Sequence, residues 1–207
     1  YNPREIKNKI SSAKNEMMSI DSFAKVEFDH KVVEVYKEYQ QKLKNGNSVD
    51  FDDLLILPIK LFRNYPRVLE EYQDRYKYIL IDEYQDTNEA QYTFSKLLSA
   101  KYRNIFVVGD NDQAIYAFRG ANYKNILNFE KDYPEAKTIL LEENYRSTKT
   151  ILNAANSVIK NNHERKDKNL WSNNATGNKI KYKEVANEKE EASFVGTEIK
   201  RLLSEGI

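Results

Sequence analysis

Residues 78–86 of the chain read YILIDEYQD, and this stretch decides the fold. Its first four residues predict a β-strand buried on both faces, and two carboxylates, Asp82 and Glu83, follow it without a spacer. Ligands bind just beyond the carboxyl ends of strands in open parallel sheets, so both carboxylates stand where a site is expected. One carboxylate there can hold Mg²⁺ while its neighbour orients an attacking water, as nucleotide hydrolysis requires. The alternative is the acidic first turn of a helix, because Asp and Glu stabilise helix N-termini.

Two further apolar runs also end in polar residues. Residues 105–108 (IFVV) lead into 109–113 (GDNDQ), and residues 138–141 (TILL) lead into 142–146 (EENYR). Periodic apolar residues between the three runs predict helices at about 89–102 and 123–131. Strands that alternate with helices indicate right-handed crossovers and a parallel sheet. The sequence therefore predicts an α/β fold in which three strands bring polar tips to one edge.

Several stretches are specific in their combination, order and spacing. They are residues 81–88 (IDEYQDTN), 107–116 (VVGDNDQAIY), 118–121 (FRGA) and 141–148 (LEENYRST), preceded by 10–15 (ISSAKN) and 48–55 (SVDFDDLL). Together they resemble successive motifs of superfamily 1 DNA helicases of the UvrD/Rep/PcrA group. The resemblance covers nearly the whole chain. It implies part of a RecA-like P-loop NTPase parallel sheet with flanking helices, preceded by a helical accessory segment.

The resemblance also implies how much of such a helicase is present. These helicases begin with a phosphate-binding loop, G-x-x-x-x-G-K-[ST], and none of the six glycines here is followed by Lys-Ser or Lys-Thr. We therefore expect an internal segment of a longer helicase that does not hydrolyse ATP by itself. Residues 1–47 are then the end of the accessory domain, 48–147 the second part of the first motor domain, and 148–207 the start of the second. Around residues 19–28 the chain is a few residues shorter than the family usually is.

Outside the strand pattern, residues 1–47 are charged and carry helical patterning. One apolar stripe indicates a helix in the first part of the chain: Val32, Val33, Val35, Tyr36, Tyr39 and Leu43. Residues 45–48 (NGNS) break this pattern, and Ser48 or Asp50 is expected to cap the next helix, so the acids at 50–53 receive no chemical role. Residues 149–161 and 188–203 also pattern as helices, whereas residues 179–185 alternate like a strand.

By resemblance, five residues take part in ATP binding and hydrolysis. Asp82 would hold Mg²⁺, directly or through water, and Glu83 would orient or deprotonate the attacking water. Gln113 would sense the γ-phosphate and tie hydrolysis to DNA contact. Arg146 would act as an arginine finger, because a planar guanidinium neutralises the charge that develops on the phosphoryl oxygens. Tyr145 would stack on the adenine.

Each of these roles has a plainer alternative. Gln113 can be a solvated loop amide, and Tyr145 can be an ordinary core aromatic residue. Arg146 can form a structural ion pair with Glu142 or Glu143, which precede it closely in the sequence. These alternatives remain open at the level of sequence.

The resemblance assigns DNA contact to Tyr116, Phe118 and Arg119. Aromatic residues at this spacing with a following arginine suit base stacking combined with a phosphate contact. The family usually has tryptophan where Phe118 stands, and phenylalanine stacks with less area and has no indole N–H. The alternative is that Phe118 is a core residue within a loop. Another run combines basic residues with an aromatic, either along a DNA backbone or as a solvated surface: His163, Arg165, Lys166, Lys168 and Trp171.

Composition narrows the class of protein only slightly. Charged residues make up 31% of the chain, yet the formal net charge is +1, so nucleic acid would have to bind in a local groove. The chain has no cysteine and only two histidines, which argues against disulfides and against a zinc cluster. No apolar run approaches the roughly 18 residues of a membrane span, and no signal-peptide pattern opens the chain. We therefore expect a soluble, intracellular protein without membrane partners, and the resemblance implies a bacterial, cytoplasmic protein associated with the nucleoid.

The resemblance implies an ATP-dependent 3′-to-5′ DNA helicase with ATP and Mg²⁺ as cofactors. Single-stranded DNA and junctions of single- and double-stranded DNA are the implied substrates, and DNA repair or replication proteins the implied partners. Two alternatives are a non-catalytic binding module derived from such a helicase and the motor part of a helicase–nuclease subunit. Asp82, Glu83, Gln113 and Arg146 are all intact, which argues against an inactivated relative.

Overall fold

The computed structural model describes residues 1–163 and 167–206, with the side chain of Arg119 excepted. Its residues form two compact units: residues 1–138 make up most of the first, and residues 139–161 with the chain from Asp167 onward make up the second. Each unit is described by itself. The expected boundary near residue 147 stays a prediction.

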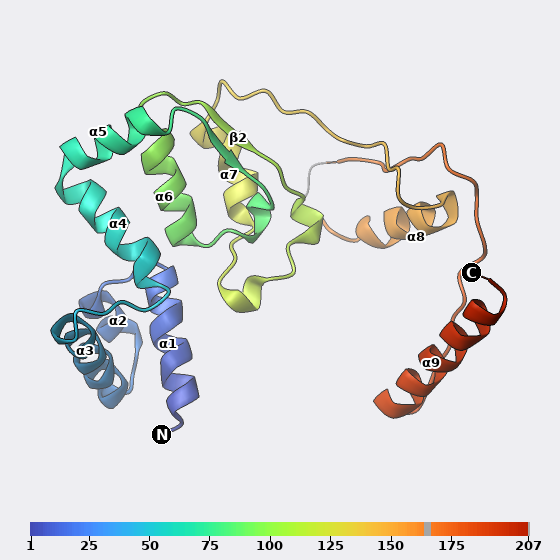
Figure 1. The fold of residues 1–207 in the computed structure, drawn as a ribbon, viewed down its shortest axis with the longest axis horizontal. Helices are drawn as coiled ribbons and strands as arrows, with labels where there is room; N and C mark the ends of the chain where they lie inside the picture. The colour runs from blue at the N-terminus through green and yellow to red at the C-terminus, as the bar shows by residue number, and fades with distance from the viewer. Residues whose placement is uncertain (164–166, 207) are drawn as a thin grey trace. The chain divides into compact units, whose positions relative to one another are not determined.

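The first unit contains most of the regular structure (Figure 1). Its α-helices are α1 (Pro3–Asn15), α2 (Ile20–Val26), α3 (His30–Asn45), α4 (Asp53–Asn64), α5 (Pro66–Arg75), α6 (Glu89–Ser99) and α7 (Lys124–Asp132). Its strands are β1 (Ile79–Ile81) and β2 (Ile105–Val107), and its 3₁₀ turns are η1 (Tyr84–Asp86), η2 (Asn111–Gln113) and η3 (Ala117–Arg119). Helices α6 and α7 begin within a residue of where the sequence predicts them.

Helices α1, α2 and α3 lie together around an apolar core of their own (Figure 1). Their amphipathic faces bury Ile10, Ala13, Phe23, Val32, Val33 and Tyr36. The predicted apolar stripe is confirmed at its centre, whereas Val35 points outward with 41% of its surface exposed. A helix has room for only one buried face, so two adjacent β-branched residues and the aromatic one turn later fill it.

The two strands are parallel, as predicted, with Ile79 opposite Ile105 and Ile81 opposite Val107. Helix α6 lies between them in sequence, and its Phe94, Ser95 and Leu98 line a hollow together with β1. The expected burial of β1 on both faces is wrong for the described residues, because Leu80 is 73% exposed. Alternate residues of a strand face opposite sides, so one face of the sheet is covered and the other is open.

Residues 138–141 were expected to form a third strand, and this prediction is wrong. Ile139 and Leu141 are 68% and 76% exposed, and no strand of the described chain pairs with them. Residues 179–185 likewise form no strand, although the sequence alternates. An extended segment becomes a strand only when a neighbour satisfies its backbone N–H and C=O groups, and alternation alone cannot supply that neighbour.

The described residues of the second unit form helices α8 (Lys149–Ile159) and α9 (Glu188–Ser204), both close to their predicted limits. Backbone hydrogen bonds tie residues 142–150 to residues 171–176. The Trp171 N–H donates to the Glu142 carbonyl at 3.0 Å, and the Asn144 N–H donates to the Trp171 carbonyl at 2.7 Å. These bonds hold the segment that carries two candidate site residues, Tyr145 and Arg146.

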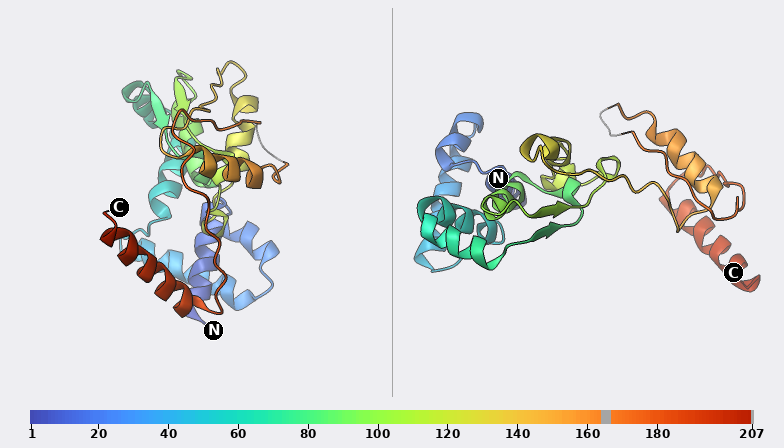
Figure 2. Two further views of the ribbon diagram at one scale, coloured as in Figure 1. Left: turned by 90° about the vertical axis from the view of Figure 1, so that its right-hand side faces the viewer. Right: turned by 90° about the horizontal axis from the view of Figure 1, so that it is seen from above.

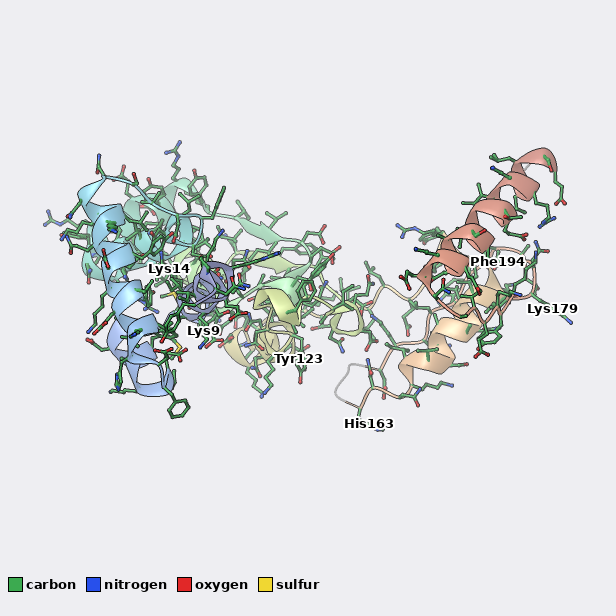
Figure 3. The ribbon with its side chains drawn as sticks, turned by 90° about the horizontal axis from the view of Figure 1, so that it is seen from below. Lys9, Lys14, Tyr123, His163, Lys179 and Phe194 are labelled. Carbon is green, nitrogen blue, oxygen red and sulfur yellow. The ribbon has the colours of Figure 1, made fainter. Side chains whose placement is uncertain are left out.

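A buried cation joins the helical group, which consists of α1, α2 and α3, to α4. The Nζ atom of Lys14, on α1, lies 2.6 Å from an Asp50 carboxylate oxygen and 2.9 Å from one of Asp53, with its side chain 2% exposed (Figure 3). Burial alone raises the pKa of Asp50, but hydrogen bonds from Lys14, the Asp53 N–H and the Tyr39 hydroxyl outweigh it, so the pKa is lowered. The acids at 50–53 therefore have a role beyond capping. Asp52 occupies the N-cap position of α4 but makes no side-chain cap hydrogen bond, whereas Asp50 accepts the N–H of Asp53, the first residue of the helix.

Substituting Lys14→Met should destabilise the protein by about 3–5 kcal/mol, because it leaves two largely buried carboxylates without their cation. Urea unfolding at neutral pH measures this. The matched control is Lys9→Met, which removes a more exposed pair with Glu27 and should cost far less stability, because solvent screens an exposed pair. Equal losses in the two variants would contradict the assignment.

Comparing Lys14→Met with the unsubstituted protein also tests how the free energy of unfolding depends on pH. A lowered folded pKa means that Asp50 contributes stability that is complete above its unfolded value of about 3.9. This stability is lost as the pH falls through the lower folded pKa. Lys14→Met removes a main cause of the lowering, so its unfolding free energy should depend less steeply on pH in this acid range.

Candidate functional site

The candidate site begins where β1 ends. Asp82 and Glu83 are both exposed, and the Glu83 N–H donates to the Asp82 carboxylate at 2.9 Å. Glu83 has φ 50° and ψ 43°, in the left-handed region that residues with a side chain rarely adopt. Helix α6 begins only at Glu89 with Asn88 as its cap, so the two carboxylates are not its first turn. Backbone strain of this kind is concentrated at functional sites, because surrounding contacts must hold it in place.

Gln85 supplies such contacts, and sequence reasoning missed it. Its side chain is 1% exposed, its Nε2 donates to a Glu83 carboxylate oxygen at 2.8 Å, and its Oε1 accepts the Asp110 N–H at 2.9 Å. The amide thus joins the residues that follow β1 to those that follow β2. The sequence shows a glutamine within a polar run but carries no signal that it is buried.

The hydrogen-bonded chain continues to Gln113. Its Nε2 donates to the Asp110 carboxylate at 2.9 Å, while Asp110 also caps the short turn η2. The series of hydrogen bonds therefore runs from Glu83 through Gln85 and Asp110 to Gln113. Two of the predicted catalytic residues come together at one edge of the sheet, as the parallel topology requires.

Gly109 allows this close approach. A Cβ atom at that position would lie 2.6 Å from the Gln85 Oε1, 2.8 Å from the Ile126 Cδ1 and 3.1 Å from the Tyr84 N. Real Cβ atoms essentially never come within 3.0 Å of such neighbours. Glycine is needed here for space rather than for an unusual backbone angle.

A hollow of about 370 Å³ adjoins the carboxylates, with an apolar floor formed by α4, β1 and α6. Its polar rim includes Asp82, Glu83 and Asp86, and the buried Oδ1 of Asp86 has no hydrogen-bond partner in the described structure. No cluster of three or more metal-binding side chains is present among the described residues. Mg²⁺ in nucleotide sites commonly uses one or two carboxylates together with substrate phosphates, so Asp82 fits as one ligand of such an ion.

The candidate DNA-contact residues lie on the segment around η3. Phe118 is 78% exposed and Tyr116 37%, with their ring centroids 6.0 Å apart and tilted by 46°. The alternative that Phe118 is a core residue does not agree with this exposure. The side chain of Arg119 lies outside the described residues.

Tyr145 and Arg146 belong to the second unit. Tyr145 is 79% exposed, so it is not a core residue, and its hydroxyl donates to Glu143 at 2.8 Å, which raises the Tyr145 pKa. Glu143 also accepts from Asn173 and Glu142 from the Asn169 N–H. Among the described contacts neither glutamate pairs with Arg146, which is exposed.

The basic run receives little structural support. Arg165 and Lys166 lie outside the described residues. Trp171 is 46% exposed and lines a hollow of about 400 Å³ with Lys149 and Lys160. The DNA-contact hypothesis for this run stays a prediction.

Comparison with known families agrees with the geometry. Residues 1–134 match the model of the UvrD/REP helicase N-terminal domain, and residues 139–207 match that of the UvrD-like helicase C-terminal domain. The chain therefore belongs to the UvrD/REP helicase family, as its motifs predicted.

Among individual proteins, the chain is similar to the ATP-dependent DNA helicase PcrA of several bacteria. It is 54% identical over 202 residues to that of Staphylococcus aureus strain Mu50, which is 96% of this chain and 28% of the relative. It is 54% identical over 209 residues to that of Bacillus subtilis strain 168, and 52% over 205 residues to that of Leuconostoc citreum. The chain spans about 28% of the length of these curated relatives. None of its described helices is long and apolar enough to cross a membrane.

Gly109→Ala should destabilise the protein by about 1–3 kcal/mol, because the added methyl group displaces Gln85 or Ile126 from close packing. Chemical unfolding measures the change. Gly196→Ala is the control: nothing lies within 4 Å of its added Cβ, and it stands inside α9, where alanine should stabilise by about 0.5–1 kcal/mol. A Gly109→Ala protein as stable as the unsubstituted one would show that the strand ends are not closely packed.

Proposed function

We propose that the chain is the central segment of an ATP-dependent 3′-to-5′ DNA helicase, which couples ATP hydrolysis to movement on single-stranded DNA and to duplex unwinding. The observation that carries this proposal is the hydrogen-bonded chain from Glu83 to Gln113 at the carboxyl ends of two parallel strands. Similarity to the PcrA helicases supports it. We assign residues 1–47 to the accessory domain, 48–147 to the first motor domain and 148–207 to the second.

In this proposal the residues at the strand ends carry out hydrolysis. Asp82 holds Mg²⁺, which neutralises charge on the phosphates of bound ATP. Glu83 orients the attacking water and accepts its proton, and Gln85 keeps the Glu83 carboxylate in place. Gln113 senses the γ-phosphate. From the second unit we assign Arg146 to the γ-phosphate and Tyr145 to the adenine.

DNA contact is assigned to Tyr116, Phe118 and Arg119. An exposed aromatic ring next to a second ring suits stacking on an unpaired base, which is tolerant of sequence. The proposed substrates are single-stranded DNA and junctions of single- and double-stranded DNA, with DNA repair or replication proteins as partners.

Substituting Glu83→Gln in the full-length protein should reduce ATP turnover by roughly 10²–10⁴-fold, because it removes the general base. The hydrogen bond from Gln85 can persist, since an amide oxygen also accepts, so ATP and DNA binding should remain. Steady-state turnover with oligo-dT, together with nucleotide binding, measures this. The matched control is Glu89→Gln at the start of α6, which should turn over normally. Near-normal turnover in Glu83→Gln would remove Glu83 from the mechanism.

Phe118→Ala should weaken single-strand binding by roughly 1–3 kcal/mol and lower DNA-stimulated turnover, because a stacking ring is lost. The melting temperature should change little, since the ring is 78% exposed. Phe118→Trp should bind oligo-dT as well or better. Phe28→Ala, which removes a ring that is 95% exposed elsewhere in the unit, is the control and should leave binding unchanged. A large loss of stability in both Phe118 variants would instead indicate core packing.

A further inference from the structure

Thr87 lies between the two candidate functional segments of the first unit. It follows η1, four residues after Glu83, and its Oγ1 donates back to the Tyr84 carbonyl at 2.8 Å. Tyr84 is 1% exposed, and its N–H donates to the carbonyl of Val108, next to Gly109. Thr87 is thus bonded directly to the turn that carries the strained Glu83.

The other bonds to Thr87 come from the segment that follows η3. Its carbonyl accepts the Asn122 N–H at 2.9 Å and the Asn125 Nδ2 at 3.1 Å, and the same Nδ2 lies 3.2 Å from the Thr87 Oγ1. Asn125 stands in the first turn of α7 with only 4% of its surface exposed. A buried amide on an amphipathic helix needs polar partners. Here the carbonyl and the hydroxyl of one threonine, Thr87, both accept from the Asn125 Nδ2.

The candidate DNA-contact segment joins directly onto this point. The Ala121 N–H donates to the Tyr116 carbonyl at 3.4 Å, which closes the loop that carries Phe118, and Asn122 follows at once. The Asn122 carbonyl in turn accepts the Asn125 N–H at 2.9 Å. A displacement of the loop therefore acts on Asn122, Asn125 and Thr87 together.

We propose that Asn125 is a positioning residue that couples contact with single-stranded DNA to ATP hydrolysis. The proposal rests on the function proposed above and concerns the route between its two sites. When DNA moves the Phe118 loop, Asn125 shifts Thr87 through two hydrogen bonds. Thr87 shifts Tyr84 through the bond from its Oγ1 to the Tyr84 carbonyl, and Tyr84 directly follows Glu83 in the chain. Neither the nucleotide nor DNA is assigned a contact with Asn125 itself.

The side-chain part of this route can be removed while the direct backbone bond from Asn122 to Thr87 stays. In Asn125→Ala the Thr87 carbonyl keeps the Asn122 N–H as donor, so no buried carbonyl is left unsatisfied. The substitution cuts only the bonds between α7 and the Thr87 side of the site. Asn128→Ala is the matched control, because Asn128 lies one turn further along α7 and its side chain accepts from Lys131.

The test measures ATP turnover of the full-length protein with and without oligo-dT, together with oligo-dT affinity and melting temperature. Asn125→Ala should lose roughly fivefold or more of the stimulation by DNA, a typical coupling between sites. Its turnover without DNA and its oligo-dT affinity should stay unchanged. Asn128→Ala should match the unsubstituted protein in every measurement.

Other outcomes separate the two proposals. If the unsubstituted protein shows no DNA-stimulated turnover, the proposed function fails. If it is stimulated and Asn125→Ala is stimulated equally, only the coupling role fails. A proportional fall in turnover with and without DNA, with a lower melting temperature, would make Asn125 purely structural and also overturn the inference.

Hydrogen exchange gives a test that does not depend on how well the variant folds. In the unsubstituted protein, oligo-dT should slow amide exchange both in residues 116–122 and in residues 84–88. Slowing that is confined to residues 116–122 would overturn the inference. In Asn125→Ala the effect at residues 84–88 should weaken while that at residues 116–122 remains, because only the Asn122–Thr87 backbone bond is still present.

Discussion

The buried amide of Gln85 holds the ends of two parallel strands together where the candidate general base stands. Its hydrogen bonds to Glu83 and from the Asp110 N–H need a separation that Gly109 alone permits, since any side chain there would displace the amide. A buried polar group without partners is costly, so this amide also penalises arrangements in which the strand ends separate. Glu83 keeps its left-handed backbone conformation because the surrounding contacts hold it in place. Figure 2 shows the two strands and their flanking helices from two further directions.

A second polar framework joins the helical group to the same site. Asn15, next to the buried Lys14, donates to Asp52 at 3.2 Å and accepts from the Asn88 side chain at 2.7 Å. Asn88 caps α6 and directly follows Thr87, so α1 is hydrogen-bonded to the segment that leads out of the site. This explains physically why residues from the helical group and from the strands fall within one compact unit.

Most helices could be predicted from the sequence because amphipathic periodicity and capping residues are local signals, although α5 was not predicted. The strands could be predicted only in part. β1 and β2 form where expected, but residues 138–141 and 179–185 form no strands. An apolar run records that a segment tends to be buried, whereas pairing depends on which other backbone lies beside it. The same limit explains why the exposure of Leu80 could not be foreseen.

For the site, the sequence by itself determined the family and the chemistry of its candidate residues, because the order and spacing of side-chain types are properties of the chain. It also placed Asp82, Glu83 and Gln113 at strand ends, since parallel strands share an edge. Only the tertiary structure decided that Gln85 and Asn125 are buried and which groups they bond. A glutamine or an asparagine looks the same in the sequence whether its side chain lies in a solvated loop or in a packed core. Their roles arise from partners 25 and 38 residues away, which no local pattern records.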